Sequence, residues 1–237
     1  MATRYAVVEL ELAESTQDEA RERYQRSEPV LVIAGHQTAG RGRLGRDWIE
    51  PDRAVFTSLA FEPAWPTGAW RLIPLAAGLA ARSAVERLTG ISVTLRWPND
   101  LLIGERKIGG LLAESADGVA VVGCGINLLW DDPIADAGAL YETDPGPAIA
   151  REFAVAWADR LLGHMECRPD DWGIDEYRDA CATIGRPVSY PGGSGIAVAV
   201  SDDGSLSVET ANGTIAVHSG EVRLHGRATL PTDPRRS

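Results

Sequence analysis

The residues of this chain that are best suited to chemistry lie in one short loop, from Gly40 to Arg46, where three glycines are interspersed with three arginines. Glycine lets the backbone approach a ligand closely, and the arginine guanidinium is a permanent cation whose fork matches phosphate and carboxylate groups. The whole chain carries a formal net charge of −11, so this basic loop contrasts with an acidic background. The loop therefore predicts an anion-binding site, for a nucleotide phosphate or for an acid that is being activated.

Two other interpretations of the same loop are open. Gly40, Gly42 and Gly45 match the G-x-G-x-x-G pattern of dinucleotide-binding folds, but that pattern needs a helix to begin there. Pro51 follows too soon for such a helix. A solvated basic turn is the other alternative, although it gives no reason for three glycines among the arginines.

A second segment places polar residues after a proline bend. Asn99 and Asp100 follow Pro98, and Lys107 and Gly110 come shortly afterwards. Asn99 is suited to bind a base or a ribose, and Asp100 offers the oxygen ligands that Mg²⁺ prefers. The alternative is an ordinary turn followed by a surface lysine on a hairpin.

Two smaller motifs supply space and hydroxyl groups. Gly123 and Gly125 interrupt an apolar segment, and glycines inside a strand mark the close approach of a ligand or of another backbone. Ser15 and Thr16 precede a predicted helix, where a hydroxyl caps the helix and can also bind a ligand. Each motif has an ordinary structural explanation, a β-bulge in the first case and a helix cap in the second.

Taken in order, these motifs resemble those of biotin–protein ligases, and the resemblance extends from about Ser15 to Leu224. The matching motifs are Ser-Thr, Gln-x-Ala-Gly-Arg-Gly-Arg-x-Gly-Arg-x-Trp, Trp-Pro-Asn-Asp-Leu, Lys-x-x-Gly-x-Leu-x-Glu, Gly-x-Gly-Ile-Asn, Gly-Arg-Pro-Val and Gly-Glu-Val. The resemblance implies ATP-dependent activation of biotin to biotinyl-AMP, with release of diphosphate. Biotin would then be transferred to a lysine of a biotin carboxyl carrier domain.

The resemblance also implies a role for each matching residue. The expected catalytic residues are Lys107, Arg41 and Arg43. The expected biotin-binding residues are Ser15, Thr16, Gln17, Gln37, Gly40, Arg41, Gly42, Arg43, Lys107, Gly110, Gly123 and Gly125. The expected nucleotide-binding residues are Arg41, Arg43, Arg46, Trp48, Asn99, Lys107 and Asn127, and Asp100 is the expected magnesium ligand.

Elementary electrostatics agrees with this assignment. Two unit negative charges about 4 Å apart repel by roughly 4 kcal/mol at an effective dielectric constant of about 20. Arginine, lysine and Mg²⁺ are the species that offset such repulsion between a carboxylate and a phosphate. The chain departs from the usual pattern at Gln17, where the family has asparagine, and at Arg96, where it has lysine. We also expect the glycine-rich loop to become ordered when ligands bind.

Two other functions compete with the ligase. A lipoate or octanoate transferase of related fold should lack the Gly-Arg-Gly-Arg loop, and a noncatalytic sensor of biotin or biotinyl-AMP would have no evident output. The expected acceptor is the carrier domain of acetyl-CoA or acyl-CoA carboxylase or of pyruvate carboxylase. Only 14 residues precede Ser15, so we expect the short form without a DNA-binding domain and without repressor activity. The oligomeric state stays open.

The elements that must position these residues follow from periodicity and turn signals. We expect strands over residues 5–12, 29–36, 54–61, 92–97, 100–103, 107–114 and 119–129. We expect helices over residues 17–26, 70–89, 148–167 and 170–182, the first with a capping box from Thr16 to Glu19. Residues 131–147 are rich in Asp, Pro and Gly and predict a loop.

The sequence pattern changes near residue 185. Short alternating segments separated by Asp-Gly and Asn-Gly turns predict hairpins. We therefore expect an α+β fold with a catalytic domain over residues 1–184, in which helices flank a mixed sheet, as in class II synthetase-like biotin ligases. A small SH3-like barrel would follow over residues 185–230, and residues 231–237 would form a disordered tail.

The composition excludes several classes of protein. No stretch approaches the ~20 apolar residues of a membrane-spanning helix, and the N-terminus lacks the apolar core of a secretory signal. Three widely spaced cysteines and four histidines form no disulfide framework and no metal-binding pattern of their own. We therefore expect a cytoplasmic protein that does not bind membranes.

Overall fold

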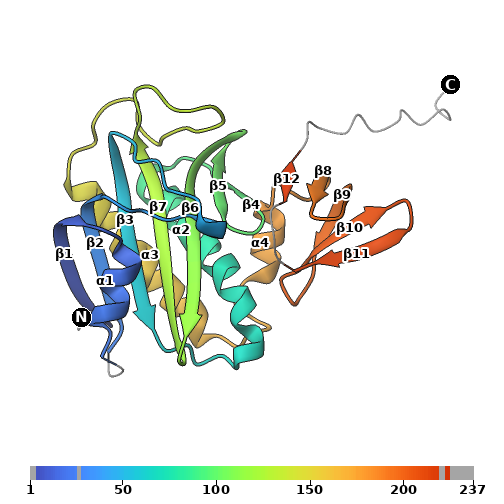
Figure 1. Ribbon diagram of the computed structural model, residues 1–237, viewed down its shortest axis with the longest axis horizontal. Helices are drawn as coiled ribbons and strands as arrows, with labels where there is room; N and C mark the ends of the chain where they lie inside the picture. Colours follow the sequence, from blue (N-terminus) through green and yellow to red (C-terminus); the bar gives the residue numbers. More distant parts are fainter. Residues whose placement is uncertain (1–3, 26–27, 219–221, 225–237) are drawn as a thin grey trace.

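A seven-stranded mixed sheet forms the larger part of the protein (Figure 1). The computed structural model describes residues 4–25, 28–218 and 222–224. Along the sheet the strand order is β1-β2-β3-β7-β6-β5-β4, with β1 parallel to β2 and every other pair antiparallel. The strands are β1 (Ala6–Ala13), β2 (Val30–Gln37), β3 (Arg53–Phe61), β4 (Thr94–Arg96), β5 (Asp100–Ile103), β6 (Arg106–Ala116) and β7 (Val119–Leu129).

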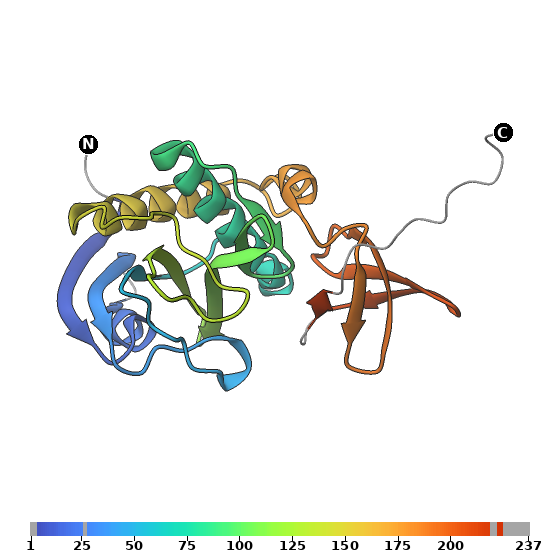
Figure 2. The same ribbon diagram turned by 90° about the horizontal axis from the view of Figure 1, so that it is seen from above.

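Helices cover the two faces of this sheet unequally (Figure 2). The long helices α2 (Ile73–Thr89) and α3 (Ala148–Glu166) pack on one face and bury the main core, whereas the short helix α1 (Thr16–Arg23) lies on the other. Side chains alternate along a strand, so Val122, Cys124 and Ile126 of β7 join the main core. The intervening residues, including two glycines, face the side of α1, and this side holds the cavity described below.

A second, five-stranded antiparallel sheet follows helix α4 (Ile174–Ala180). Its strand order is β11-β10-β9-β8-β12. The strands are β8 (Pro187–Tyr190), β9 (Gly193–Val200), β10 (Leu206–Thr210), β11 (Gly213–Val217) and β12 (Arg223–Leu224). Direct hydrogen bonds link this smaller part to the larger one, since Trp97 Nε1, just after β4, donates to the carbonyl of Gly204 and Arg178 Nε on α4 donates to that of Val200 on β9.

The predicted α+β architecture is confirmed, and most elements lie within one or two residues of their expected bounds. The long helix after residue 70 begins later, because residues Thr67–Leu72 form a 3-10 turn, and it ends as expected at Gly90, whose φ is 71°. The helix expected over 170–182 covers only Ile174–Ala180, because Gly173 has a φ of 108° and cannot extend it. The expected tail at 231–237 lies outside the described residues.

The expected capping box at Thr16 is wrong. The residue that precedes the helix is Ser15, and its side chain makes no capping hydrogen bond. The hydroxyl of Thr16 is turned instead toward the sheet, where it bonds other side chains. Within the part of the chain that the structure describes, none of the helices is long and apolar enough to cross a membrane.

Candidate active site

One cavity of about 510 Å³ opens on the α1 side of the larger sheet. The basic loop, strands β3, β6 and β7, the start of α1 and the bend at Pro98 all contribute to its wall. The predicted site residues that line it are Ser15, Thr16, Gln17, Gln37, Arg41, Gly42, Arg43, Arg46, Trp48, Asn99, Asp100, Lys107, Gly110, Gly123, Gly125 and Asn127. Four segments far apart in the sequence therefore meet around one volume.

Gly40 is the predicted site residue that does not line the cavity. It is buried behind the wall, where an added Cβ would lie 3.0 Å from Gln37 Nε2 and 3.2 Å from Trp48 Cβ. Such a distance is tighter than ordinary van der Waals contact, so a side chain there would push both neighbours. Gly40 thus provides the space in which two lining side chains pack, and its expected direct contact with biotin stays a prediction.

One end of the cavity is built from neutral hydrogen-bonding groups. The backbone N–H and the hydroxyl of Thr16 both donate to Gln37 Oε1, at 2.8 and 3.1 Å. The hydroxyl of Thr16 also lies 2.8 Å from Ser58 Oγ, and because a hydroxyl has one proton to donate, Ser58 is the donor in that bond. Thr16 and Ser58 are almost completely buried, so this end is fixed before any ligand arrives.

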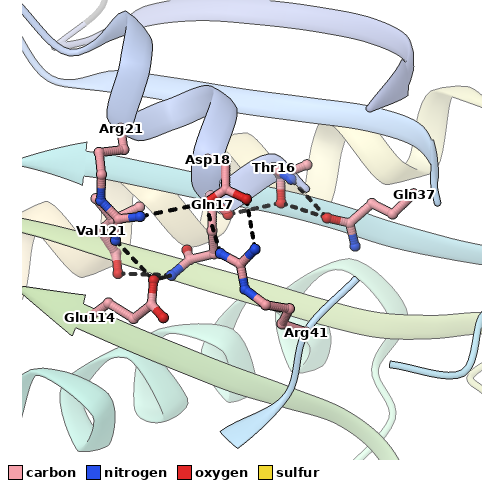
Figure 3. Close-up of polar contacts among 9 residues, drawn as sticks. Thr16, Gln17, Asp18, Arg21, Gln37, Arg41, Glu114 and Val121 are labelled. Atoms are coloured by element: carbon pink, nitrogen blue, oxygen red, sulfur yellow. Dashed lines mark hydrogen bonds and ion pairs between the residues drawn. The ribbon is translucent and has the colours of Figure 1, made fainter. Parts of the chain in front are cut away.

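Gln17 occupies the same end and is held by strands β6 and β7 (Figure 3). Its Nε2 donates to Glu114 Oε2 and to the carbonyl of Val121, both at 3.3 Å. These two acceptors fix the orientation of the amide, because the oxygen could not replace the nitrogen there. Gln17 Oε1 is consequently left buried with no hydrogen-bond partner. Gly123 leaves room for it, since a Cβ there would lie 2.9 Å from this oxygen.

The other end of the cavity is cationic. Asp100 lies between two cations, with Lys107 Nζ 2.7 Å from Oδ1 and Arg96 Nη2 2.6 Å from Oδ2. Burial opposes the ionisation of Asp100, but the charges of Lys107 and Arg96 outweigh it and hold the pKa of this carboxyl below its usual range. The carboxylate therefore fixes the position of both cations.

Arg43 reaches the same end from the basic loop. Its Nη1 donates to Asn99 Oδ1 at 3.0 Å, and Asn99 Nδ2 in turn donates to the carbonyl of Leu111 on β6 at 3.0 Å. Burial lowers the pKa of Arg43, although the charge of Asp100 opposes this effect. Asn99, expected to contact the nucleotide, holds Arg43 and the strand with both ends of its side chain.

Arg41 takes a different direction (Figure 3). Its Nη1 and Nη2 lie 2.6 and 2.8 Å from the two carboxylate oxygens of Asp18 on helix α1. The hydrogen bond to Asp18 raises the pKa of Arg41. The two predicted catalytic arginines of the loop thus separate: Arg43 joins the cationic end and Arg41 binds the helix.

Trp48 forms the part of the wall between the two ends. Its ring lies against Gly125, where an added Cβ would come within 2.8 Å of the ring carbons. Lys107 Nζ lies 5.7 Å from the ring centroid, within the range of a cation–π contact. Arg46 lines the outer part of the cavity, with Nε 3.4 Å from the carbonyl of Arg43.

Three buried polar atoms in the wall have no protein partner among the described residues: Gln17 Oε1, Trp48 Nε1 and Asn127 Oδ1. A buried polar atom without a hydrogen bond costs about 1–3 kcal/mol. Asn127 is nevertheless well anchored, because its Nδ2 donates to the carbonyl of Gly138 at 2.8 Å. The wall therefore holds unmet hydrogen-bonding capacity that a ligand can satisfy.

Several lining residues were not predicted. Ser58 is one of them. The polar pair Thr57-Ser58 inside an otherwise apolar strand could have indicated that this strand faces a polar site. Residues 134–137 of the long loop also line the cavity, held there by backbone hydrogen bonds between Lys107 and the pair Asp136 and Gly138. Residues 222–224, at the last strand of the second sheet, complete the wall, whereas the glutamate of the Gly-Glu-Val motif, Glu221, lies outside the described residues.

The donor set does not fit the predicted magnesium ligand. Both carboxylate oxygens of Asp100 already face a cation, and a second positive ion there would be repelled by Lys107 and Arg96. Within residues 4–25, 28–218 and 222–224, no cluster of three or more His, Cys, Asp or Glu side chains is arranged to hold a metal ion. Asp100 is therefore the partner of two cations, an arrangement that disfavours its predicted role as a metal ligand.

Comparisons with known proteins agree on one family. The model of the biotin/lipoate A/B protein ligase family matches residues 10–131, and that of the biotin protein ligase C-terminal domain matches residues 183–224. The biotin–[acetyl-CoA-carboxylase] ligase of Mycobacterium tuberculosis is 36% identical over 209 residues, covering 81% of this chain and 78% of that protein. The bifunctional ligase/repressor BirA of Bacillus subtilis is 29% identical over 234 residues, and the match covers 89% of this chain and 71% of that protein. The structure of the Aquifex aeolicus biotin protein ligase in complex with biotin and ATP superimposes with a TM-score of 0.79 at 27% identity, covering 93% of this chain and 98% of that one.

Proposed function

The chain belongs to the biotin/lipoate A/B protein ligase family, and from this premise we propose how its cavity works. The enzyme is a biotin–protein ligase that uses ATP to activate biotin and transfers it to acetyl-CoA carboxylase. The observation that carries the proposal is the division of one cavity into a neutral hydrogen-bonding end and a cationic end. Biotin has the same division, with a neutral cyclic urea at one end and a carboxylate at the other.

We propose that the urea ring lies at the neutral end. Its N–H groups need acceptors, and Gln17 Oε1 is a buried acceptor without a partner. Gly123 and Gly125 leave the floor of the cavity without side chains, so a flat bicyclic ring can lie close to β7. Thr16 already hydrogen-bonds both Gln37 and Ser58, so the three residues present a prearranged polar surface to the ring.

The cationic end is the proposed place of the first reaction step. The carboxylate oxygen of biotin attacks the α-phosphorus of ATP, and diphosphate leaves, which yields the mixed anhydride biotinyl-AMP. Lys107 and Arg43 face both negative groups and reduce their repulsion, while Asp100 keeps Lys107 in place. Three cations against one carboxylate leave this end with surplus positive charge for the ligands.

In the second proposed step, a lysine amine of the carrier attacks the carbonyl carbon of biotinyl-AMP. An amide bond forms, AMP leaves with its phosphate, and the amine loses a proton. We propose that Lys107 and Arg43 hold the departing phosphate, because they already face the phosphate before the attack. Trp48 and Asn127 offer the donor and the acceptor that remain in the wall for the nucleotide.

Several finer assignments belong to the same proposal. ATP would enter as its magnesium complex, with the metal supplied by the nucleotide substrate rather than held by Asp100. The acceptor would be the carrier domain of acetyl-CoA or acyl-CoA carboxylase, with pyruvate carboxylase as a second acceptor, and the enzyme would act in the cytoplasm. We expect no DNA binding, since nucleic-acid binding draws on a basic surface and this chain carries a formal net charge of −11. A salt-resistant complex with an operator in a gel shift would contradict that last expectation.

Transfer of labelled biotin to a purified carrier domain tests the proposal directly. We expect label on the carrier and release of AMP when biotin, ATP and Mg²⁺ are present, and neither product when any of the three is omitted. Lipoate in place of biotin should give no transfer, because the neutral end would then have no urea to bind. Label transfer from biotin without AMP release would contradict the two-step reaction.

A further inference from the structure

The ion pair between the basic loop and helix α1 has no part in the two reaction steps. Arg41 meets Asp18 with both terminal nitrogens, which is the geometry in which an arginine and a carboxylate bind most strongly. The hydrogen bond from Arg41 holds the pKa of Asp18 below its usual range. The carboxylate is therefore ionised and available to the loop throughout the physiological pH range.

Two kinds of contact hold the loop in place. At its base, backbone N–H groups of Thr38 and Trp48 donate to carbonyls of Ala13 and Gly40, at 3.0 and 2.9 Å. At its tip, Leu44 is 65% exposed and has a φ of 61°, a left-handed conformation that is unfavourable for leucine. Backbone hydrogen bonds such as that from Gly42 N–H to the Arg46 carbonyl, at 2.7 Å, close the tip on itself. Its exposed Leu44 does not attach it to the rest of the protein, so the side chains on either side of it supply that attachment.

The two arginines of the loop provide these side-chain contacts in different places. Arg43 bonds Asn99 inside the cavity, where an arriving phosphate competes for its guanidinium. Arg41 also lines the cavity, but its partner Asp18 does not and lies on the exposed surface of helix α1. The contact between Arg41 and Asp18 is therefore the one that can persist while the cavity is filled.

The surroundings of Asp18 direct it toward Arg41. The nearest competing cation is Arg21, whose Nη1 lies 3.5 Å from Asp18 Oδ1. Arg21 is itself held by Glu114, since its Nη2 lies 2.8 Å from Glu114 Oε2 (Figure 3). The shorter, two-point contact of Asp18 is with Arg41.

We propose that Asp18 is a positioning residue that latches the Gly40–Arg46 loop onto helix α1 through Arg41 and so lengthens the residence of biotinyl-AMP in the cavity. The second half of this statement rests on the proposed function, because biotinyl-AMP is the intermediate of that reaction. The first half concerns the protein without ligands. In this arrangement Arg41 controls loop closure, and Arg43 contacts the reacting phosphate.

Hydrogen exchange of the ligand-free protein tests the latch. In Asp18→Asn we expect amides of residues 38–48 to exchange about three- to fivefold faster, the effect of losing an exposed but well-formed ion pair. Asp18→Glu should restore part of the protection. Glu19→Gln is the matched control, because Glu19 lies in the same helical turn but pairs with Arg23. Equal exchange in Asp18→Asn and wild type, or equally fast exchange in Glu19→Gln, would overturn the latch.

Dissociation of the intermediate tests the consequence for the reaction. Labelled biotinyl-AMP would be formed on the enzyme from biotin and ATP and then chased with unlabelled biotin. We expect about three- to fivefold faster loss of label from Asp18→Asn, with the rate of formation changed by less than about twofold. Unchanged loss of label would overturn the role in residence time. A wild-type enzyme that fails to biotinylate any carrier, yet shows exchange that depends on Asp18, would refute the proposed function and leave the latch standing.

Discussion

The two ends of the cavity satisfy their polar groups in opposite ways. At the neutral end, Thr16 bonds both Ser58 and Gln37, and one acceptor, Gln17 Oε1, is left without a partner among the described residues. At the cationic end, Asp100 holds two positive side chains but does not neutralise the whole group. We propose that the first end recognises the urea ring by its shape and by one hydrogen bond to Gln17 Oε1. The second acts through charge that is fixed in advance. We therefore expect substitutions at the neutral end to change biotin affinity and those at the cationic end to change the rate.

Replacing Lys107 by alanine should give the largest effect and test the cationic end. We expect kcat for biotinyl-AMP formation to fall by about 10²–10³, the usual cost of removing one preorganised charge at a reacting oxygen. The affinity for biotin should change little, because the proposed place of the urea ring is the other end. Biotin-dependent exchange of diphosphate into ATP measures the rate, and calorimetric titration measures the affinity. Arg106→Ala, a cation next to Lys107 on β6 that does not line the cavity, is the control.

Replacing Asp100 by asparagine should give the next largest effect. We expect kcat to fall about tenfold because Lys107 and Arg96 lose their fixed position, and stability to fall by about 1–3 kcal/mol. The Mg²⁺ concentration for half-maximal activity should stay unchanged, and a clear increase would restore Asp100 as a metal ligand. Because the folded-state pKa of Asp100 is lowered, its stabilising contribution is present above the unfolded pKa of about 3.9 and is lost as the pH falls further.

Gly123→Ala tests the neutral end. The new Cβ would lie 2.9 Å from Gln17 Oε1, so the amide must move and the hydrogen bond to biotin is weakened. We expect the KM for biotin to rise about tenfold, equivalent to about 1.4 kcal/mol, with kcat nearly unchanged. Gly163→Ala is the matched control, because a Cβ at Gly163 on helix α3 meets no atom within 4 Å. A fall in kcat without a change in KM would remove the distinction between the two ends.

His164 should affect neither end and gives the smallest kinetic effect. Burial, and to a lesser extent the charge of Arg160, lowers the pKa of His164 to about 4. The unfolded chain binds a proton at about pH 6.5, so stability is complete above that pH and declines as the pH falls toward 4, by about 2–3 kcal/mol. Urea denaturation at pH 7 and pH 5 measures this decline. His164→Phe should reduce it and leave kcat and KM unchanged.

Local patterns were enough to predict the strands, the long helices and the cationic side chains. The cavity face of β7 follows from alternation. Alternation alone would place Lys107 and Gly110, three residues apart, on opposite faces of β6, and the register shift opposite Leu101 and Leu102 brings both to the cavity. The packing role of Gly40 was missed because a glycine that lines the cavity and a glycine that packs behind its lining residues have the same sequence pattern. The capping prediction at Thr16 failed because a residue 42 positions away, Ser58, competes for the same hydroxyl.

The remaining errors concern charge partners, which depend on packing between distant segments. An acidic residue early in a helix is common, so nothing in the sequence marks Asp18 as the partner of Arg41, which is 23 positions away. The two arginines of the loop are equivalent by type and spacing, and only the position of helix α1 separates them. Asp100 likewise resembles a metal ligand until Arg96 and Lys107 are found on either side of it.

Residues 222–224, close to the end of the described chain, form part of the cavity wall, and this makes the active site a joint product of both sheets. A fragment ending at residue 184 would keep the neutral groups and the cations but leave one side open to water. Water admitted there would hydrolyse a mixed anhydride before a carrier lysine arrives. We therefore expect the small sheet to shield the reactive intermediate from water, and mixing the two separately made fragments should recover tight retention of biotinyl-AMP only if they reassociate.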